Sequence, residues 1–377
     1  MKSLSKNALD KLNSYIPIYD EQWKYTKINQ FDKFDFNKIK APNDLKVSDP
    51  LLNHLKLENA LKNNTNNCRN IFNKVIPNNK NKFILCNTAH LKSGDYFYLG
   101  SSCIANKPIY IKNIINKNDS NSFYNKRFFF HFDKNSSATI VLDELHNFKT
   151  LSNIVYEFYL EENSNIELII NSNKPQTTQI LNLGAKINSN ACLKIFPIDI
   201  SGELIKNNYF INLEKSNSEF HYNSLNLLNN NNYVDNYIEV NHNTKNTLSQ
   251  INQKNILQDK SKGVFYSKSI IKENSSNSQA HQHNNNLILS QNSMVHSNPQ
   301  LMIYNDDVEC SHGSTTGKID DDALFYLRSR GINLDNAKQI LLNAFLNDII
   351  DNIKNEEINL NIKEKTNSWI NNYANKK

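Results

Sequence analysis

The sequence predicts a mainly β protein, a parallel β-helix core with helical regions at both ends. Short apolar stretches alternate with polar corners through the middle of the chain, and the corners recur about every 25 residues, which is typical of stacked coils. The 377 residues also exceed the roughly 250–300 at which one compact core stops growing, whereas stacked coils extend a core by repetition. Helix signals occur near both ends. We therefore predict a helical region over 1–85, a β-helix core over 86–317 and a helical domain over 318–377.

The first region carries short helix patterns separated by prolines. The apolar spacing at 8–12 and at 51–55 fits two short helices. Pro17, Pro42 and Pro50 interrupt the segments around them, because proline cannot continue a helix.

The predicted corners are asparagines followed by serine or threonine. Both residue types suit tight corners, because their side chains bond nearby backbone and asparagine tolerates left-handed conformations. The spacings between successive pairs are 28, 25, 29, 26, 31 and 18 residues. The pairs begin at Asn135, Asn163, Asn188, Asn217, Asn243, Asn274 and Asn292. Two alternatives stay open: chance pairs in an asparagine-rich chain, and a β-sandwich or antiparallel barrel, which needs turns about every 8–12 residues.

The sequence of the last region predicts three helices. Asp320 is a good N-cap for a short helix that Gly331 ends. A longer helix is expected from about Asp335, and a third contains Trp369 and Ile370. A stripe at i, i+3, i+4 spacing, apolar except for one aspartate, runs along the longer helix and comprises Ala337, Ile340, Leu341, Ala344, Phe345, Asp348 and Ile349. These helices either cap the solenoid or present a face to a partner.

Composition narrows the classes of function. The net charge of +6 comes mostly from lysines in a chain rich in asparagine, lysine and isoleucine, so it indicates coding bias rather than a nucleic-acid partner. No secretory leader and no run of about 18 apolar residues occurs, so we expect a cytoplasmic protein that crosses no membrane. The five cysteines are scattered without zinc-type spacing, which favours a reducing compartment: Cys68, Cys86, Cys103, Cys192 and Cys310.

Cys310 and His312 are the strongest candidates for chemistry. They lie two residues apart, so they would share one face of an extended strand, and a thiolate and an imidazole suit iron or zinc. Two ligands do not complete a metal site, so others would come from elsewhere in the chain or from a second subunit. A buried structural cysteine beside a surface histidine is the alternative. His281 and His283 also share a face, but without a nearby carboxylate or cysteine they are weaker candidates, and a polar ladder is expected there.

Motifs for catalysis are missing from the sequence. It contains neither a GxxxxGK[ST] nor a GxGxxG loop, so the chain is not expected to hydrolyse ATP. GxSxG and HExxH are also absent. Polysaccharide-cleaving β-helix enzymes gather carboxylates on one strand face, whereas the adjacent Asp143 and Glu144 would point to opposite faces. We therefore predict that the chain has no catalytic residues.

Several segments resemble the SufB/SufD family, scaffold subunits of the Suf system for iron–sulfur cluster assembly. The segment 310–331 reads CSHGSTTGKID and then DDALFYLRSRG, close to the family's CSHGATVG, acidic stretch and LFYLRSRGI. NLILS at 286–290 and PQLMIYNDDV at 299–308 are similar to its NLLLS and PQLEIYADDV, and EQWKYT at 21–26 is similar to its EEWKYT.

The resemblance is dense only from about 238 to 350 and favours the SufD branch of the family. SufB-type members typically carry a Glu-His-Glu segment where this chain has Cys310, Ser311 and His312. Ser314 and Thr316 stand where alanine and valine are usual, which are mild departures.

The resemblance implies a right-handed parallel β-helix and a non-catalytic scaffold of an ATPase-driven complex. It implies pairing with a SufB subunit through the β-helix ends and a transient iron or iron–sulfur cluster at that interface, with no permanently bound cofactor. His312 would be the cluster-assembly ligand, with Cys310 beside it. A SufC ATPase would bind the C-terminal helices at a face that includes Leu324, Phe325, Tyr326, Arg328, Ile340 and Phe345. The system occurs in bacterial cytoplasm and in plastid stroma, and the former is expected here. A SufB-like paralogue and, more remotely, a carbohydrate-active β-helix enzyme are the alternatives.

Overall fold

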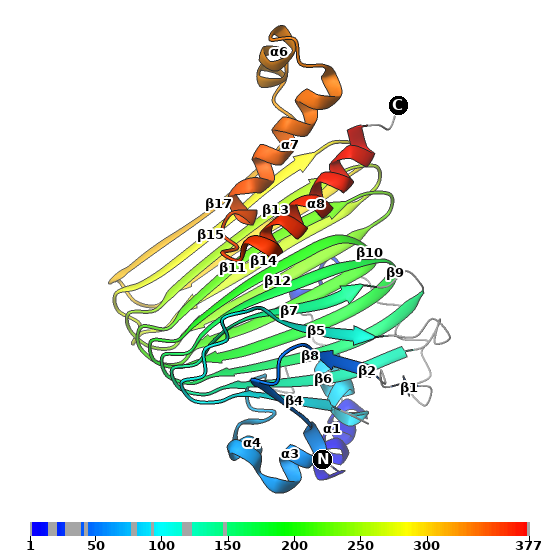
Figure 1. Cartoon of the computed structure of the whole chain (residues 1–377). Coiled ribbons are helices and arrows are strands. Elements are labelled where there is room, and N and C mark those ends of the chain that lie inside the picture. Colours follow the sequence, from blue (N-terminus) through cyan, green and yellow to red (C-terminus); the bar gives the residue numbers. More distant parts are fainter. Residues whose placement is uncertain are drawn as a thin grey trace.

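The computed structural model describes residues 2–13, 21–26, 39–40, 44–76, 81–91, 94–114, 123–145 and 149–374. Within these ranges the chain is mainly β, and helices flank a solenoid of stacked strands (Figure 1). This confirms the predicted fold class.

Short elements precede the solenoid: α1 (Lys2–Asn13), the 3-10 helix η1 (Glu21–Trp23), β1 (Ile39–Lys40), β2 (Asp44–Val47), β3 (Leu52–Lys56), α3 (Leu57–Asn63), the 3-10 helix η3 (Thr65–Asn67), α4 (Cys68–Ile71) and α5 (Lys82–Ala89). The helix predicted at 8–12 is confirmed as part of α1. The helix predicted at 51–55 is wrong, because this segment forms β3, antiparallel to β4. Pairing with β4 overrides the local spacing, and His54 Nε2 lies 2.8 Å from Asp95 Oδ1 across the two strands.

The solenoid is built from parallel strands: β4 (Gly94–Leu99), β5 (Ile109–Ile114), β6 (Phe123–Phe132), β7 (Ser137–Leu145), β8 (Thr150–Leu160), β9 (Asn165–Ile187), β10 (Cys192–Leu213), β11 (Glu219–Leu228), β12 (Tyr233–His242), β13 (Leu248–Leu257), β14 (Lys262–Ile271), β15 (Ser278–Ile288), β16 (Met294–Ile303) and β17 (Val308–Gly317). One column of pairs runs β5–β7–β9–β10–β11–β13–β15–β17. The other runs β4–β6–β8–β9–β10–β12–β14–β16. The long strands β9 and β10 belong to both columns.

Asparagines in the left-handed conformation turn the chain at the corners. The predicted corners Asn135, Asn163 and Asn217 have φ of 56°, 58° and 59°. Asn163 Nδ2 donates to Asn135 Oδ1 at 2.9 Å, so successive corners are joined by side-chain amides as well as by strands. At the pairs predicted to begin at 188, 243 and 274, the left-handed residues lie slightly later, at Asn190, Asn246 and Asn277. From Asn135 to Asn277 the corners are 27 to 31 residues apart. The pair at 292–293 lies between β15 and β16, at the other bend of a coil, which explains its short spacing.

The lumen of the solenoid changes from apolar to polar along its axis. Near the N-terminal end it holds stacked aromatic rings, and Phe130 lies 4.5 Å from Phe97 and 4.6 Å from Phe158 between ring centroids. The same row of positions continues through aliphatic residues to Ser269 on β14, and Leu301 on β16 follows it. Ser269 and Ser267 are fully buried on the same face as Phe265 and Ile271, so polar groups join the apolar ones in the interior of the last coils.

Three helices follow the solenoid: α6 (Asp321–Ser329), α7 (Leu334–Ile350) and α8 (Glu356–Ala374). Asp320 Oδ1 accepts from the backbone N–H groups of Asp322 and Ala323, which confirms the predicted N-cap. Gly331 has φ of +89°, a conformation that favours glycine, and the short helix ends just before it as predicted. Trp369 and Ile370 are buried in α8.

The helices α7 and α8 pack on the outer face of one strand column (Figure 1). The buried face of α7 comprises Ala337, Leu342, Leu346, Ile349 and Ile350. The predicted stripe is therefore partly wrong, because Ile340, Ala344 and Asp348 are exposed. The sheet surface that receives α7 selects the adjacent leucines, a choice that helical spacing alone does not make.

N-terminal segments cover the outer face of the other column. Gly184 on β9 permits the close approach of Ile76, because a Cβ at Gly184 would lie 1.9 Å from Ile76 Cγ1. Arg127 and Glu157 form a fully buried ion pair, with Nη2 and Oε1 2.6 Å apart. Arg127 also donates to Thr88 Oγ1 at 2.7 Å and to Asn73 Oδ1 at 2.8 Å, so this one guanidinium joins the N-terminal segments to the solenoid.

Candidate functional site

Cys310 and His312 lie on β17. This strand lies at one end of the strand stack, which we call the open end of the solenoid (Figure 1). It pairs in parallel with β15 and stacks Cys310 on Ala280 and His312 on Gln282. The side chains of β16 and β17 are half-buried or exposed, whereas most of those in the middle coils are buried. This end of the solenoid is therefore accessible to another molecule.

Both residues continue rows that line the lumen. The row that ends at His312 passes through Ile140, Leu168, Ile195, Tyr222, Ile251 and Gln282. The row that ends at Cys310 passes through Ala138, Ile166, Leu193, Phe220, Ser249 and Ala280. The two residues thus share a face, as predicted from their spacing. Because none of the described residues forms a coil that covers β17, His312 is exposed and Cys310 half-buried.

A network of buried polar groups supports this end from inside. Gln282 Nε2 donates to Ser269 Oγ at 2.7 Å and to the Gln300 carbonyl at 3.0 Å. Asn255 Nδ2 donates to Asn286 Oδ1, and Asn286 Nδ2 donates to the Thr315 carbonyl at 2.9 Å. These bonds satisfy amides that would be costly to bury alone, and they hold β15 and β17 in a fixed register beneath the exposed pair.

Cys310 holds its proton in the isolated chain. Burial raises the pKa of the thiol, and Glu309 raises it further, against a backbone hydrogen bond from Ala280 that lowers it. Only the thiolate is a good metal ligand, so a metal ion at this end would have to displace the proton. His312 supplies an imidazole, a ligand type that suits iron and zinc.

The helix α6 follows this end of the solenoid and extends away from the strands (Figure 1). It carries exposed apolar side chains. Phe325 is 74% exposed and Tyr326 57% exposed. Leu324 is half-buried and Arg328 exposed. In α7, Ile340 is 45% exposed. Such a cluster of exposed apolar side chains is typical of an interface.

Phe345 occupies a different position from the other residues of that predicted face. Lys254 Nζ lies 4.7 Å from the centroid of its ring and donates to the Phe345 carbonyl at 2.7 Å. Lys254 also pairs with Asp348 at 2.5 Å. Phe345 therefore contacts the solenoid and fixes α7 to it.

Residues 113–345 match the family described as "SUF system FeS cluster assembly, SufBD core domain". The chain belongs to the SufB/SufD family. The match extends from the first coils through the Cys310–His312 end to the middle of α7.

Some of the relatives in the SufB/SufD family are named SufD, and others are named only as SufBD family proteins. The chain is 35% identical over 157 residues to the iron–sulfur cluster assembly protein SufD of Escherichia coli, which covers 42% of this chain and 37% of that protein. It is 27% identical over 203 residues to a SufBD family protein of Synechocystis, which covers 54% of this chain and 45% of that protein. It is 29% identical over 103 residues to SufD of Bacillus subtilis, and this match covers 27% of this chain and 24% of that protein. The matched regions thus span less than half the length of these relatives.

The predicted pair His281 and His283 lies on the opposite face of the sheet from His312. On β15, His281 Nδ1 lies 2.8 Å from Ser311 Oγ, and both side chains face outward. His283 borders a groove that also contains Lys254 and Asp348. They form part of a polar ladder on the outer surface and do not join Cys310 and His312.

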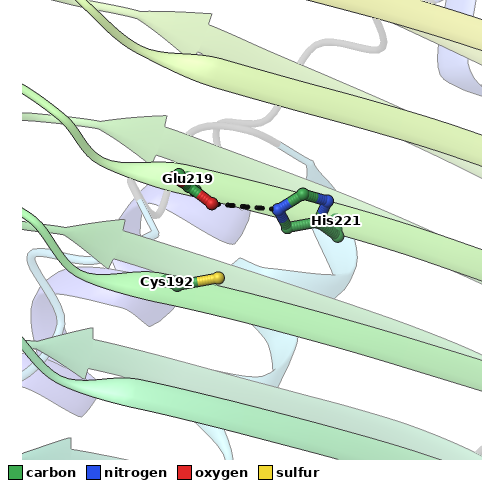
Figure 2. Close-up of side chains that lie close together, drawn as sticks. All are labelled: Cys192, Glu219 and His221. Carbon is green, nitrogen blue, oxygen red and sulfur yellow. Dashed lines mark hydrogen bonds and ion pairs between the residues drawn. The ribbon is translucent and has the colours of Figure 1, made fainter. Parts of the chain in front are cut away.

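Sequence reasoning missed a second group of ligand-type side chains, Cys192, Glu219 and His221 (Figure 2). Their donor atoms all lie within 4.8 Å of one another, and His221 Nε2 lies 3.2 Å from Glu219 Oε2. Burial raises the pKa of the Cys192 thiol to about 12, and Glu219 contributes to the rise. The signal was present in the spacing, because Cys192 and Glu219 are 27 residues apart, which is one coil.

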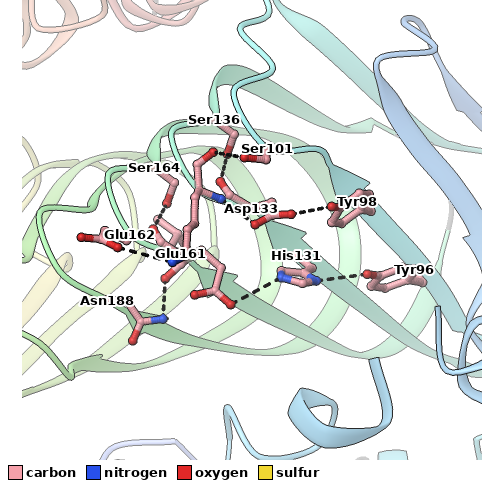
Figure 3. Close-up of polar contacts among 12 residues, drawn as sticks. Tyr96, Tyr98, Ser101, His131, Asp133, Ser136, Glu161, Glu162, Ser164 and Asn188 are labelled. Carbon is pink, nitrogen blue, oxygen red and sulfur yellow. Dashed lines mark hydrogen bonds and ion pairs between the residues drawn. The ribbon is translucent and has the colours of Figure 1, made fainter. Parts of the chain in front are cut away.

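A further polar cluster joins the corners after β6 and β8 (Figure 3). Tyr98 Oη donates to Asp133 Oδ2 at 2.6 Å, and Tyr96 Oη lies 3.1 Å from His131 Nδ1. His131 Nε2 lies 3.9 Å from Glu161 Oε1. Burial lowers the pKa of His131 to about 4 despite the nearby Asp133, so the imidazole is neutral at neutral pH. We interpret this cluster as a structural link between coils.

None of the helices in the described ranges is long and apolar enough to cross a lipid bilayer.

Proposed function

We propose that this chain is a SufD-type scaffold subunit on which iron–sulfur clusters assemble together with a SufB partner. The observation that carries the proposal is the accessible pair Cys310 and His312, at the open, polar end of a solenoid whose core matches the SufBD family. Solenoid ends expose strand edges that readily receive another chain, so this end is suited to pairing with a second solenoid. Iron or a nascent cluster would be the cargo, held transiently between the two subunits, and no resident cofactor is needed.

Mixed imidazole and thiol ligation suits a transient site. Iron–sulfur clusters are held firmly by four cysteine thiolates, whereas this end supplies one imidazole and one protonated thiol. The remaining ligands would come from the SufB side, so the site is half of a shared one. His312 is the main ligand of this half, because it is exposed, whereas Cys310 is half-buried and its thiol pKa is raised. A catalytic role for this chain is not proposed.

His312→Ala should lower the iron and sulfide recovered on the reconstituted complex by at least about 10-fold, because losing a direct ligand should cost no less than losing an outer-shell partner. Iron and sulfide assays on the purified complex measure the effect. His283→Ala is the matched control, an exposed histidine one strand away on the other face. Equal cluster content in the His312→Ala complex and the wild-type complex would show that His312 is no ligand.

We propose further that α6 and α7 bind a SufC-type ATPase. The exposed Phe325, Tyr326 and Ile340 supply the apolar centre of the interface and Arg328 a charged group beside it. ATP-driven movement of the ATPase would pass through α7, which Lys254 fixes to β13, to the open end of the solenoid. The chain lacks a phosphate-binding loop of its own, so the hydrolysis must occur in the partner.

Phe325→Ala should weaken binding of the ATPase subunit about 30-fold or more, the loss of about 2 kcal/mol expected for an aromatic side chain at the centre of an interface. Titration calorimetry with the purified ATPase subunit measures it. Leu360→Ala is the control, an apolar residue of α8 that is 60% exposed and lies outside the proposed face. If both variants bind as tightly as the wild type, the partner contacts another surface.

Co-purification separates the SufD-type assignment from the alternative of a SufB-like homodimer. A SufD-type chain should draw out both the ATPase subunit and a separate SufB chain, whereas a SufB-like paralogue should pair with itself. We propose the cytoplasm as its compartment, although one relative, 39% identical over 72 residues, is a chloroplastic protein of Arabidopsis thaliana.

A further inference from the structure

We propose that Cys192, Glu219 and His221 form a binding site for a divalent transition-metal ion such as Zn²⁺ or Fe²⁺ on the outer face of the solenoid (Figure 2). This site would be separate from the open end. It joins a thiol, a carboxylate and an imidazole, the three side-chain types that bind such ions, and it leaves a fourth position for water.

The strand register brings the three groups together. Parallel pairing of β10 with β11 places Cys192 directly beside Glu219, and His221 follows two residues later on the same face. Their donor atoms lie within 4.8 Å of one another. Ligands around a tetrahedral zinc ion lie roughly 3.3–3.8 Å apart, given bonds of about 2.0–2.3 Å. Small rotations of side chains on a rigid sheet would therefore close the site.

The hydrogen bonds of His221 suit a metal ion. Nδ1 lies 3.1 Å from Gln250 Oε1, and Nε2 lies 3.2 Å from Glu219 Oε2. A neutral imidazole has one N–H, so it can donate to only one of these two oxygens. If the Nδ1–H group of His221 donates to Gln250, then His221 Nε2 and the Glu219 carboxylate both offer lone pairs. A cation between these two groups would bind both. An outer partner that orients a ligating histidine in this way is typical of metal sites.

The exposure of the three side chains gives an ion access to the site, and their charges favour its binding. The side chain of Glu219 is 48% exposed and that of His221 17% exposed, and Cys192 is half-buried. Binding of the ion releases the thiol proton to solvent, and the resulting thiolate and carboxylate together balance a charge of +2. The neighbouring Lys194 and Glu167 carry opposite charges and influence the Cys192 thiol in opposite directions.

Binding of Co²⁺ tests the site, since Co²⁺ occupies such sites and its bond to a thiolate gives a charge-transfer absorption. The titration uses the full chain with Cys310→Ser and His312→Ala, so that the open end cannot contribute. We expect about one Co²⁺ per chain with the thiolate band. Cys192→Ser should remove the band, Glu219→Gln and His221→Ala should weaken binding at least about 10-fold, and Gln250→Ala should weaken it about 10–100-fold.

The matched control is Cys103→Ser, another half-buried free cysteine, which should leave the titration unchanged. Glu219→Gln keeps the shape of an exposed side chain, so it tests the site even if Cys192→Ser fails to fold. No thiolate band, or a band that survives Glu219→Gln and His221→Ala at full affinity, would overturn the proposal. Because the open-end pair is removed throughout, neither result bears on cluster assembly.

Discussion

Arg127→Met should destabilise the protein by about 3–5 kcal/mol, the cost of leaving one member of a buried ion pair without its partner. Both side chains are 0% exposed, and Arg127 donates one hydrogen bond each to Glu157, Thr88 and Asn73. Loss of the guanidinium leaves Glu157 buried with a negative charge and releases the N-terminal segments from the solenoid. Urea unfolding followed by circular dichroism measures the change in the free energy of unfolding.

The double variant Arg127→Met, Glu157→Leu provides the control. Buried ion pairs can often be replaced by apolar residues of similar volume at little cost, so the second change should recover much of the lost stability. Lys134→Met is a surface comparison, because Lys134 pairs with Glu162 where both side chains are about half exposed, and it should cost less than about 1 kcal/mol. A double variant less stable than Arg127→Met would contradict the assignment of the cost to the unpaired Glu157.

Acidification should destabilise the folded chain through His242, a histidine buried in the lumen. Its Nδ1 lies 2.7 Å from Thr247 Oγ1 and its Nε2 2.9 Å from Ser249 Oγ. Burial lowers its pKa to about 3, whereas in the unfolded chain it titrates near 6.5. Between these values the unfolded chain binds a proton that the folded chain does not. The free energy of unfolding therefore falls as the pH falls below about 6.5, by about 1.4 kcal/mol for each pH unit.

Urea unfolding between about pH 7 and pH 4.5 measures this slope, with an expected loss on the order of 3 kcal/mol from His242. His242→Gln removes this titrating group and should lower the slope by about half, because His131, whose pKa burial lowers to about 4, contributes over the same pH range. This holds even if the stability of the variant at pH 7 is lower. His283→Gln, at an exposed histidine, should keep the wild-type slope. Asp95 does not disturb this window: burial alone would raise its pKa, but His54, Lys126 and Lys56 hold it at about 2. Identical slopes for the wild type and His242→Gln would refute the prediction.

The repeat could be predicted from the sequence because its cause is local. Asparagine adopts the left-handed conformation at little cost, so the corners are encoded where they occur, as Asn135, Asn163 and Asn217 show. Caps are equally local, and Asp320 was recognised for that reason. The strand at 51–55 could not be recognised in this way, because its apolar spacing allows a helix and only its pairing with β4 makes it a strand.

Of the two candidate sites, one could be recognised from local spacing and the other depends on how the coils stack. Cys310 and His312 could be recognised because they lie two residues apart on one strand. Cys192 and Glu219 are separated by a whole coil, and a shift of one residue in the register would move them to opposite faces. The face of α7 depended on the sheet surface that it contacts, which is why Leu342 and Leu346 are buried and Ile340 is exposed.

By itself, the sequence determined the fold class, the corner residues, the helix caps and the position of Cys310 and His312 on one strand face. The tertiary structure decided the rest: that these two residues lie at the open end of the solenoid, that Phe345 contacts the solenoid while Phe325 is exposed, and that Cys192, Glu219 and His221 meet. The physical reason is that left-handed corners, caps and strand alternation depend on a few neighbouring residues. Stacking register and packing partners depend on residues a coil or more away, and these long-range contacts select among arrangements that are locally equivalent.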